Sequence, residues 1–306
     1  MPITAFVDKI YLPEFVEKQL RPATRKQYKD VWKNHLKARV GSLTLRGFRT
    51  MHGEQILQRI AVDAGLGRSS LRHCKAFLSG VFKQAKRLGV LDGLNPMQDT
   101  SLPRTAESAE TYAYSLPEIT TMLSVLAEPE RTVVLLAAFT GLRKSEIRGL
   151  RWSDFDGAQL TVNRSRWNKF ESEPKTRRSK APIPIVKQLG EALEKHRLRS
   201  GVLTQPDLPI FQNGTGTPLH LDNLARRILA PAFALKKIGW HGWHAFRRGL
   251  ATNLNALGVD PKDIQAILRH STLALTMNIY VKSVNESQTT ALDSLSERMG
   301  QTDVIH

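Results

Sequence analysis

A stretch without any apolar period, GLNPMQDTSLPRTAESAE at 93–110, divides the 306-residue chain into two parts of different character. Gly, Pro, Ser and Thr at this density favour turns and linkers over regular elements. Before the stretch, apolar residues recur only at helical spacing. After it, helical segments surround two β-like runs, at 159–167 and 181–186. The pattern predicts a mainly α fold with a small antiparallel sheet, in two domains: 1–105 and 113–306, with a linker at about 93–112.

Caps, stops and periodicity predict the individual elements. Thr24 is a candidate cap for the second helix. Ser115 and Glu118 have the spacing of a capping box, and Asp260-Pro261 is typical of a helix start. The two β-like runs are expected to form one hairpin with a long basic tip. The expected helices cover 4–20, 24–39, 52–63, 69–89, 115 onward, 131–141, 144 onward, 186–199, 221–237, 244–257, 260–270 and 286–298.

The charge balance points to a polyanionic partner. Lys and Arg number 45 against 28 Asp and Glu, a formal charge of +17. Residues 1–105 hold 19 of the basic and 8 of the acidic residues, so the first part is the more basic per residue. Nucleic acid is the first expectation, because binding to phosphates rewards such an excess. A membrane surface is the weaker alternative, since the basic residues are not gathered on one amphipathic helix.

Cysteine content and hydropathy bear on the compartment. The single cysteine, Cys74, cannot form an internal disulfide, which fits a reducing cytosol and an inert, buried thiol. The N-terminus has no signal-peptide pattern, and the longest apolar run, at 133–139, is too short to span a bilayer. We therefore expect a cytoplasmic protein that has no membrane partner.

Four short segments of the second part hold residues suited to phosphoryl transfer. GLRKSEI (141–147) places Arg143 at a helix start, where its fork is able to bind a phosphate. PKTRRSKAPIPI (174–185) places Lys175 on the expected hairpin tip. HAFRR (244–248) puts His244 and Arg247 on one helix face. LRHSTLALTMNIY (268–280) holds His270 and Tyr280.

Each segment by itself also fits an ordinary structural role. Arg143 beside Glu146 suits a surface ion pair, charged hairpin tips are usually only solvated, and Tyr280 suits an amphipathic helix end. His241 and His244 have HxxH spacing, but no acidic residue at metalloprotease spacing and no cysteine accompany them. The four segments occur together, in this order, in one basic chain, and this combination favours catalysis over these structural roles.

In their order along the chain and in their residue types, the four segments resemble the motifs of the tyrosine recombinase (phage integrase) family. Its signature comprises a TGLRxSE-like segment, a hairpin lysine, an HxLR-like box, an LGHSS-like turn and a nucleophilic IY. This chain has TGLRKSEI, EPKTRRSKAPIPI, HAFRR, LRHST and NIY, so the resemblance covers roughly 115–285. It implies an N-terminal helical core-binding (SAM-like) domain, a catalytic domain, and cleavage through a 3′-phosphotyrosine without any cofactor or metal.

The resemblance implies a role for each residue of the set. Arg143 and Arg247 would hold the scissile phosphate, and Lys175 would protonate the leaving 5′ oxygen. His244 would assist proton transfer, His270 would hydrogen-bond the phosphate, and Tyr280 would attack. Unassisted, a phenol is a poor nucleophile, so cationic and hydrogen-bonding neighbours are required.

The chain departs from the family pattern at several positions. Phe246 stands for the usual leucine, Arg269 stands for a glycine, and Gly249-Leu250 stands where Thr-Phe is usual. Arg269 is expected either to contact DNA or to adjust the turn. Besides the catalytic set, the expected DNA contacts are Arg25, Lys26, Lys29, Lys75, Arg177, Arg178, Arg248 and Arg269.

The family arrangement implies double-stranded DNA as the partner and four protomers that pair two DNA sites, with accessory DNA-bending or directionality proteins as further candidate partners. The helix at 286–298 is expected to dock either on a neighbouring protomer or on its own domain. An additional arm-binding domain is not expected ahead of the first helices. The expected function is integration or excision of a phage or mobile element. The alternatives are chromosome or plasmid dimer resolution, a type IB topoisomerase and a DNA-binding regulator without catalysis.

Overall fold

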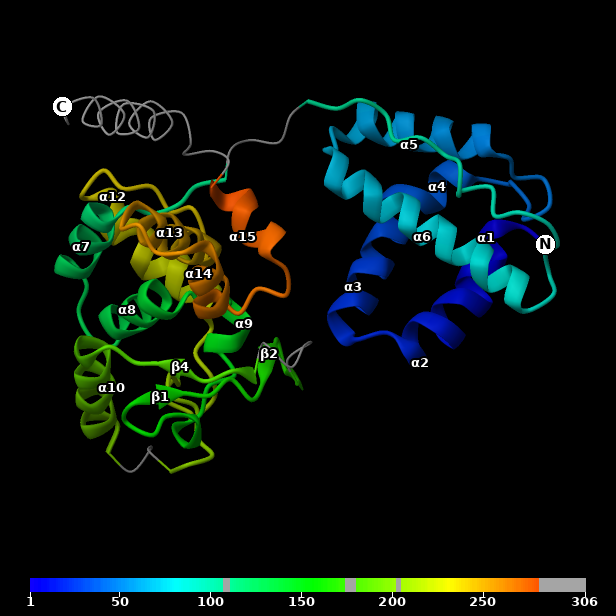
Figure 1. Ribbon diagram of the computed structural model, residues 1–306. Helices are drawn as coiled ribbons and strands as arrows, with labels where there is room; N and C mark the ends of the chain where they lie inside the picture. The colour runs from blue at the N-terminus through cyan, green and yellow to red at the C-terminus, as the bar shows by residue number, and fades with distance from the viewer. Residues whose placement is uncertain (107–110, 174–179, 202–204, 281–306) are drawn as a thin grey trace, which may run out of the picture. The chain divides into compact units, whose positions relative to one another are not determined.

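The computed structural model describes residues 1–106, 111–173, 180–201 and 205–280, and the chain forms two compact units, Met1–Glu110 and Thr111–His306 (Figure 1). The described part is mostly helical, with two small antiparallel sheets. The fold class expected from the sequence is therefore confirmed.

The first unit is entirely helical in its described elements. One continuous helix comprises α1 (Ile3–Phe6), the wider-turned η1 (Val7–Val16) and α2 (Glu17–Gln19). Pro13 lies inside it and lacks an N–H, which accounts for the local widening. A second comprises α3 (Pro22–Val31), η2 (Trp32–Leu36) and α4 (Lys37–Val40). The helices α5 (Thr50–Ala64) and α6 (Arg68–Arg87) follow.

The expected cap at Thr24 is wrong. The helix begins two residues earlier, with extended Arg21 as the cap residue and Pro22 in the first turn. Proline fixes the φ that a first helical residue needs and lacks only an N–H that would have no intrahelical partner there. Thr24 therefore lies inside the helix.

An apolar stripe on α6 forms the centre of the first core. Leu71, Phe77, Leu78 and Phe82 are fully buried, and Cys74 is buried beside them. Burial raises the pKa of the Cys74 thiol to about 11, so it remains protonated and inert at neutral pH. From the segment expected as a linker, Met97 packs into this core and Thr100 is buried against it.

The second unit combines helices with the two small sheets. Ser115 and Glu118 form the expected capping box, with Glu118 Oε2 accepting from Ser115 N at 2.8 Å. Asp260 Oδ1 accepts from Lys262 N at 2.7 Å. The helices are α7 (Leu116–Ser124), α8 (Glu130–Thr140), α9 (Lys144–Ile147), η3 (Trp152–Asp154), α10 (Lys187–Ser200), α11 (Leu221–Leu224), η6 (Ala225–Leu229), α12 (Ala230–Ala234), α13 (Trp243–Ala256), α14 (Pro261–Leu268) and α15 (Leu273–Tyr280).

The single long hairpin expected between 159–167 and 181–186 is only partly correct. β1 (Gln159–Leu160) does pair with β4 (Ile183–Pro184), but β2 (Ser165–Trp167) pairs with β3 (Phe170–Ser172) in a separate sheet. The strand breaks because buried Asp154 accepts from Asn163 Nδ2 at 2.9 Å and Arg164 Nη1 at 2.8 Å. Asn168, at φ 52°, then closes a tight turn between β2 and β3.

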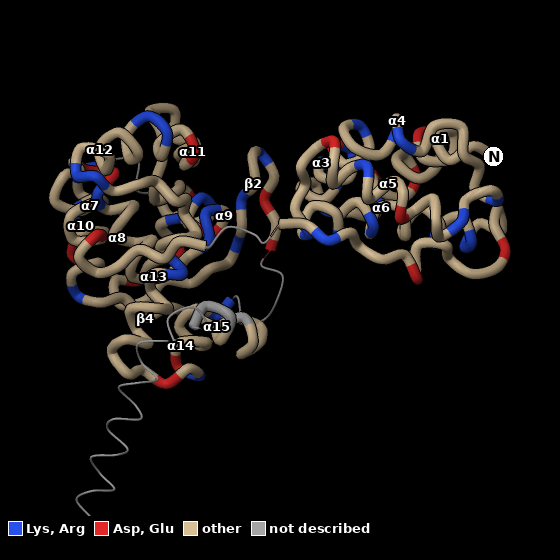
Figure 2. The backbone as a smooth tube through the Cα atoms, turned by 90° about the horizontal axis from the view of Figure 1, so that it is seen from above, with Lys and Arg blue, Asp and Glu red and all other residues tan. Residues whose placement is uncertain are grey.

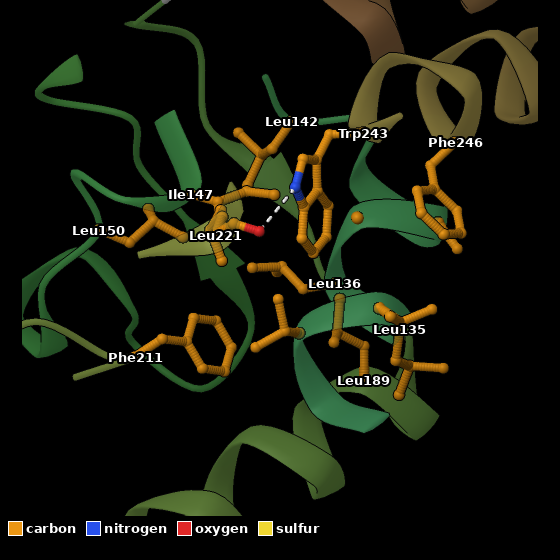
Figure 3. Close-up of a cluster of buried hydrophobic side chains, with 14 of the residues drawn as sticks. Leu135, Leu136, Leu142, Ile147, Leu150, Leu189, Phe211, Leu221, Trp243 and Phe246 are labelled. Atoms are coloured by element: carbon orange, nitrogen blue, oxygen red, sulfur yellow. Dashed lines mark hydrogen bonds between the residues drawn. The ribbon is translucent and has the colours of Figure 1, made fainter. Parts of the chain in front are cut away.

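The core of the second unit lies beneath the elements that hold the candidate catalytic residues. α8 packs against α13 and α10. Figure 3 shows Leu135, Leu136 and Phe246 meeting in this cluster, with Trp243 Nε1 donating to Leu221 O at 3.3 Å. A rigid apolar base therefore supports the starts of α9 and α13. Across the described residues, no helix is long and apolar enough to cross a membrane.

Candidate active site

A left-handed turn after α8 presents Arg143. Gly141 ends α8 at φ 57°, and a side chain there would come within 2.8 Å of Leu268 Cδ2. Leu142 is buried, so Arg143 is held at the cap position of α9. Glu146 Oε2 accepts from Arg143 N at 2.9 Å, and Glu146 Oε1 accepts from Arg143 Nη1 at 2.8 Å. The guanidinium is thereby steered while remaining open to solvent.

Helix α13 provides His244 and Arg247. The Arg247 side chain is fully buried, and its guanidinium donates three hydrogen bonds. Nη1 donates to Gly141 O at 2.6 Å, Nη2 donates to Leu268 O, and Nε donates to His270 Nε2 at 3.3 Å. A guanidinium has five N–H groups, so two remain for another acceptor. Arg247 therefore connects the α8–α9 turn, α13 and the α14–α15 turn.

His270 lies buried in the turn between α14 and α15. Its Nε2 accepts from Arg247, so in the neutral ring the proton is on Nδ1. Nδ1 is 2.8 Å from Thr276 Oγ1 on α15, to which it then donates. This hydrogen bond joins the Arg247 cluster to the helix that ends in Tyr280.

The electrostatics of the cluster keep both histidines neutral and the arginine charged. Burial first, then Arg247, Arg248 and Arg143, lower the pKa of His244 to about 4. Burial first, then Arg247 and Arg143, lower the pKa of His270 to about 4. Burial and Arg143 lower the pKa of Arg247 to about 9, which leaves it protonated at neutral pH. A bound phosphate would raise all three pKa values, because it stabilises the protonated forms.

Arg269 lies buried in the turn that precedes His270. It is 3% exposed, and its Nη2 donates to Glu146 Oε2 at 2.9 Å. Burial on its own would raise the pKa of Glu146, but Arg269 and the hydrogen bonds from Arg143 outweigh it and lower that pKa. This pairing fits a role of Arg269 within the turn, and the expected DNA contact of Arg269 stays a prediction.

The other expected DNA contacts differ in their surroundings. On α3, Arg25 pairs with Glu17 at 3.7 Å, Lys29 also pairs with Glu17, and Lys26 pairs with Asp30. Lys75 donates to Thr100 O at 2.5 Å. In the second unit, Arg248 Nε donates to Tyr112 O at 2.5 Å. Lys and Arg occur on several elements of each unit, α9 and β2 among them (Figure 2).

Several expected residues lie outside the described part of the chain. These are Lys175, Arg177 and Arg178, and the helix expected at 286–298. Tyr280 is the last residue of α15. Arg143, His244, Arg247 and His270 come together in one cluster of electrostatically interacting side chains.

Two members of the cluster are not predicted from the sequence. Glu146 is expected there only as a possible surface partner, although it is 4% exposed and meets two arginines. Thr276 is fully buried against His270. Glu146 carries a usable sequence signal, since Arg-x-x-Glu at a helix start has capping-box spacing. Thr276 carries none, since its partner is known only once the turn is folded.

A basic cavity of about 630 Å³ opens beside His244. Arg226, Arg248, Lys144, Asp222 and Trp240 line it. His241 is held at its edge by Tyr112, with ring centroids 3.6 Å apart. Within the described residues, His241 and His244 belong to no group of three or more side chains that suits a metal ion. Cationic groups around an aromatic ring are suited to a nucleic-acid strand.

Comparison with known proteins identifies the family. Residues 113–287 match the phage integrase family, which is more than half of the chain. The chain belongs to that family. It is a tyrosine recombinase, an enzyme of DNA strand breakage and rejoining.

The recombinase has relatives along most of its length. It is 26% identical over 322 residues to a XerC-like tyrosine recombinase from Caldanaerobacter subterraneus subsp. tengcongensis, covering 94% of this chain and 81% of the relative. A putative integrase/recombinase from Sinorhizobium fredii is 30% identical over 167 residues, covering 54% of this chain and 82% of the relative.

Two solved structures share the fold of the recombinase. The Tn1549 transposon integrase, in complex with transposon right end DNA, matches with a TM-score of 0.76 at 19% identity, covering 97% of this chain and all of that one. A lambda integrase dimer bound to a core site matches with a TM-score of 0.69 at 18% identity, covering 91% and 95%.

Proposed function

We propose that this recombinase cuts double-stranded DNA at a specific site by attack of Tyr280 on the scissile phosphate. The product is a 3′-phosphotyrosine, which the 5′ hydroxyl of a partner strand later attacks. The proposal rests on the cluster that Arg247 connects, because it gathers two guanidiniums and two imidazoles from three separate turns and helices. The proposed catalytic set is Arg143, Lys175, His244, Arg247, His270 and Tyr280.

The arginines supply charge where the reaction needs it. The phosphodiester carries one negative charge, and the pentacoordinate state carries two. Arg247 has two N–H groups to offer, and Arg143 is steered but open to solvent. Preorganised cations of this kind stabilise developing charge without reorganisation. They would bind the two non-bridging oxygens.

The proton steps follow from the protonation states. A bond forms between the Tyr280 oxygen and phosphorus, and the bond from phosphorus to the 5′ oxygen breaks. The phenol proton must leave, and His244 is available to accept it because its lowered pKa keeps the ring unprotonated at neutral pH, while a bound phosphate would make the ring a stronger base by raising that pKa. Lys175 gives a proton to the leaving 5′ oxygen. To hydrogen-bond the phosphate, His270 has to carry a proton on Nε2 in place of its bond from Arg247, with Nδ1 then accepting from the Thr276 hydroxyl.

A trapping experiment tests this proposal and reveals the target sequence at the same time. The full chain is incubated with a library of duplexes that have a randomised core and a fixed nick, so that the short cleaved end diffuses away. Covalent complexes are recovered in detergent, and their DNA is sequenced. We expect one family of sequences, attached through a 3′ phosphate, in the presence of EDTA and without ATP.

Tyrosine variants identify the nucleophile. Tyr280→Phe should abolish trapping while DNA binding persists. Tyr112→Phe is the matched control, because it removes a hydroxyl from the same unit, bonded to Glu118, and should keep trapping. Covalent complexes with Tyr280→Phe would show that the nucleophile is misassigned. Trapping that EDTA prevents would contradict the metal-free mechanism.

For the biological role we propose integration or excision of a mobile element or phage, acting in the cytoplasm as a tetramer that pairs two sites. The XerC-like relative, aligned over 94% of the chain, favours dimer resolution as a second candidate. Trapped sequences mapped onto the genome of the source organism separate them. Sites at both ends of one element support integration and excision, whereas one chromosomal site supports dimer resolution.

Two further alternatives have their own readouts. A type IB topoisomerase would relax supercoiled plasmid of any sequence, and its trapped sequences would show no consensus. A DNA-binding regulator without catalysis would give no covalent complex at all. Accessory bending or directionality proteins would be recognised by their effect on recombination between paired sites, while single-site trapping stays unchanged.

A further inference from the structure

A buried ion pair joins the turn before His270 to the start of helix α9. The Arg269 and Glu146 side chains are 2% and 5% exposed, and Arg269 Nη2 lies 2.9 Å from Glu146 Oε2. The same carboxylate also holds Arg143, through its Oε1 at 2.8 Å. One buried carboxylate therefore faces two guanidiniums, of which only Arg143 opens to solvent.

The backbone at Arg269 makes an arginine there a costly choice. Its φ of 56° and ψ of 41° lie in the left-handed region, where glycine is unstrained and a residue with a Cβ is not. The pair with Glu146, 123 positions away, offsets this strain. An arginine held in an unfavourable conformation suggests that its side chain has a role.

That role follows from the charges in the cluster. Arg247 lies close enough to Arg143, Glu146 and Arg269 to interact electrostatically with all three. Among the described residues, Arg247 and these three neighbours comprise three guanidiniums and one carboxylate, an excess of two positive charges that suits a doubly negative transition state. Without Arg269, Glu146 would instead cancel the charge of Arg143, in surroundings where charges are weakly screened.

We propose that Arg269 is a positioning residue for strand cleavage, which neutralises Glu146 so that Arg143 acts on the scissile phosphate with its full charge. The inference rests on the proposed function, because it requires a phosphate between Arg143 and Arg247. It also predicts that Arg269 affects the rate of cleavage rather than the affinity for DNA. A direct DNA contact would do the opposite.

The test compares two substrates built on the duplex recovered in the trapping experiment. One has the ordinary scissile phosphodiester, and the other has a neutral methylphosphonate at that position. Arg269→Gly should cut the ordinary substrate roughly ten- to a hundredfold more slowly under saturating, single-turnover conditions. On the methylphosphonate, whose transition state has one charge fewer, the deficit should shrink to about threefold or less.

A second variant tests whether Glu146 is the group being neutralised. Glu146→Gln combined with Arg269→Gly removes both charges, so the double variant should recover most of the lost rate. Arg269→Lys should retain much of it. Arg131→Gln removes an arginine that pairs with Glu128 at the far end of α8, and it should leave cleavage unchanged. Arg269→Gly relieves backbone strain, and its unfolding temperature should show that it folds.

Three results would overturn the inference: a wild-type rate for Arg269→Gly, an equal deficit on both substrates, or a loss of DNA affinity in place of rate. Deficits that simply add in the double variant would also contradict it. These outcomes are distinct from failure of the proposed function, in which the unmodified chain would trap no DNA.

Discussion

At the scale of single residues, the site is defined by which groups carry charge at neutral pH. His270 is buried, accepts from Arg247 and donates to Thr276, so its surroundings favour the neutral ring. Because its pKa is lowered, His270 is less protonated in the folded protein than in the unfolded chain between about pH 4 and 6.5. Stability from this group is thus fully present above pH 6.5 and lost as the pH falls toward 4.

This linkage gives a pH prediction. Between pH 7 and pH 5, protonation of the unfolded-state imidazole should remove about 2 kcal/mol from the free energy of unfolding. His270→Asn should lack this part of the pH dependence, although it is less stable throughout. Urea unfolding at pH 5, 6 and 7, followed by tryptophan fluorescence, measures the difference between the two proteins. Parallel pH dependences would mean that His270 has the same pKa in the folded and unfolded states, which contradicts the lowered pKa.

At the scale of elements, the features that depend on neighbouring residues can be predicted from the sequence, and those that depend on distant residues cannot. The caps at Ser115 and Asp260 follow from residues three or fewer positions apart. The division of the hairpin is not predictable because it depends on Asp154 binding Asn163 and Arg164. The candidate catalytic residues stand out through their order along the chain, and four of them do meet. The partner of Arg269 cannot be predicted, since nothing local relates it to Glu146.

The turn after α8 provides a test of how tightly the elements fit. Gly141→Ala should destabilise the second unit by about 2–4 kcal/mol, because it combines left-handed strain with contact against Leu268 and Leu250. Trapping should fall as well, because Gly141 O holds Arg247. Gly258→Ala is the matched control: its φ is 77° with nothing within 4 Å, so it should cost only about 1 kcal/mol. Equal losses in urea unfolding would refute the packing argument.

At the scale of the whole molecule, the net charge of +17 predicts binding that weakens steeply with salt. If Lys26 and Lys29 on α3 contact phosphates, changing both to Gln should reduce the slope of log affinity against log salt by about 2. Cleavage at saturating protein should be unchanged. Lys18→Gln, which removes an exposed lysine paired with Glu14, should barely alter the slope. Equal slopes for the three proteins would place the phosphate contacts elsewhere.

The partners of Arg247 have a consequence for how this site tolerates change. Two of its three hydrogen bonds go to main-chain oxygens, those of Gly141 and Leu268. Every amino acid carries the same carbonyl, so a substitution nearby cannot delete these acceptors and can only shift them by reshaping a turn. The position of the guanidinium therefore depends on the backbone conformation of the two turns and not on which side chains the turns carry. Many substitutions of the surrounding side chains should therefore leave the position of Arg247 unchanged.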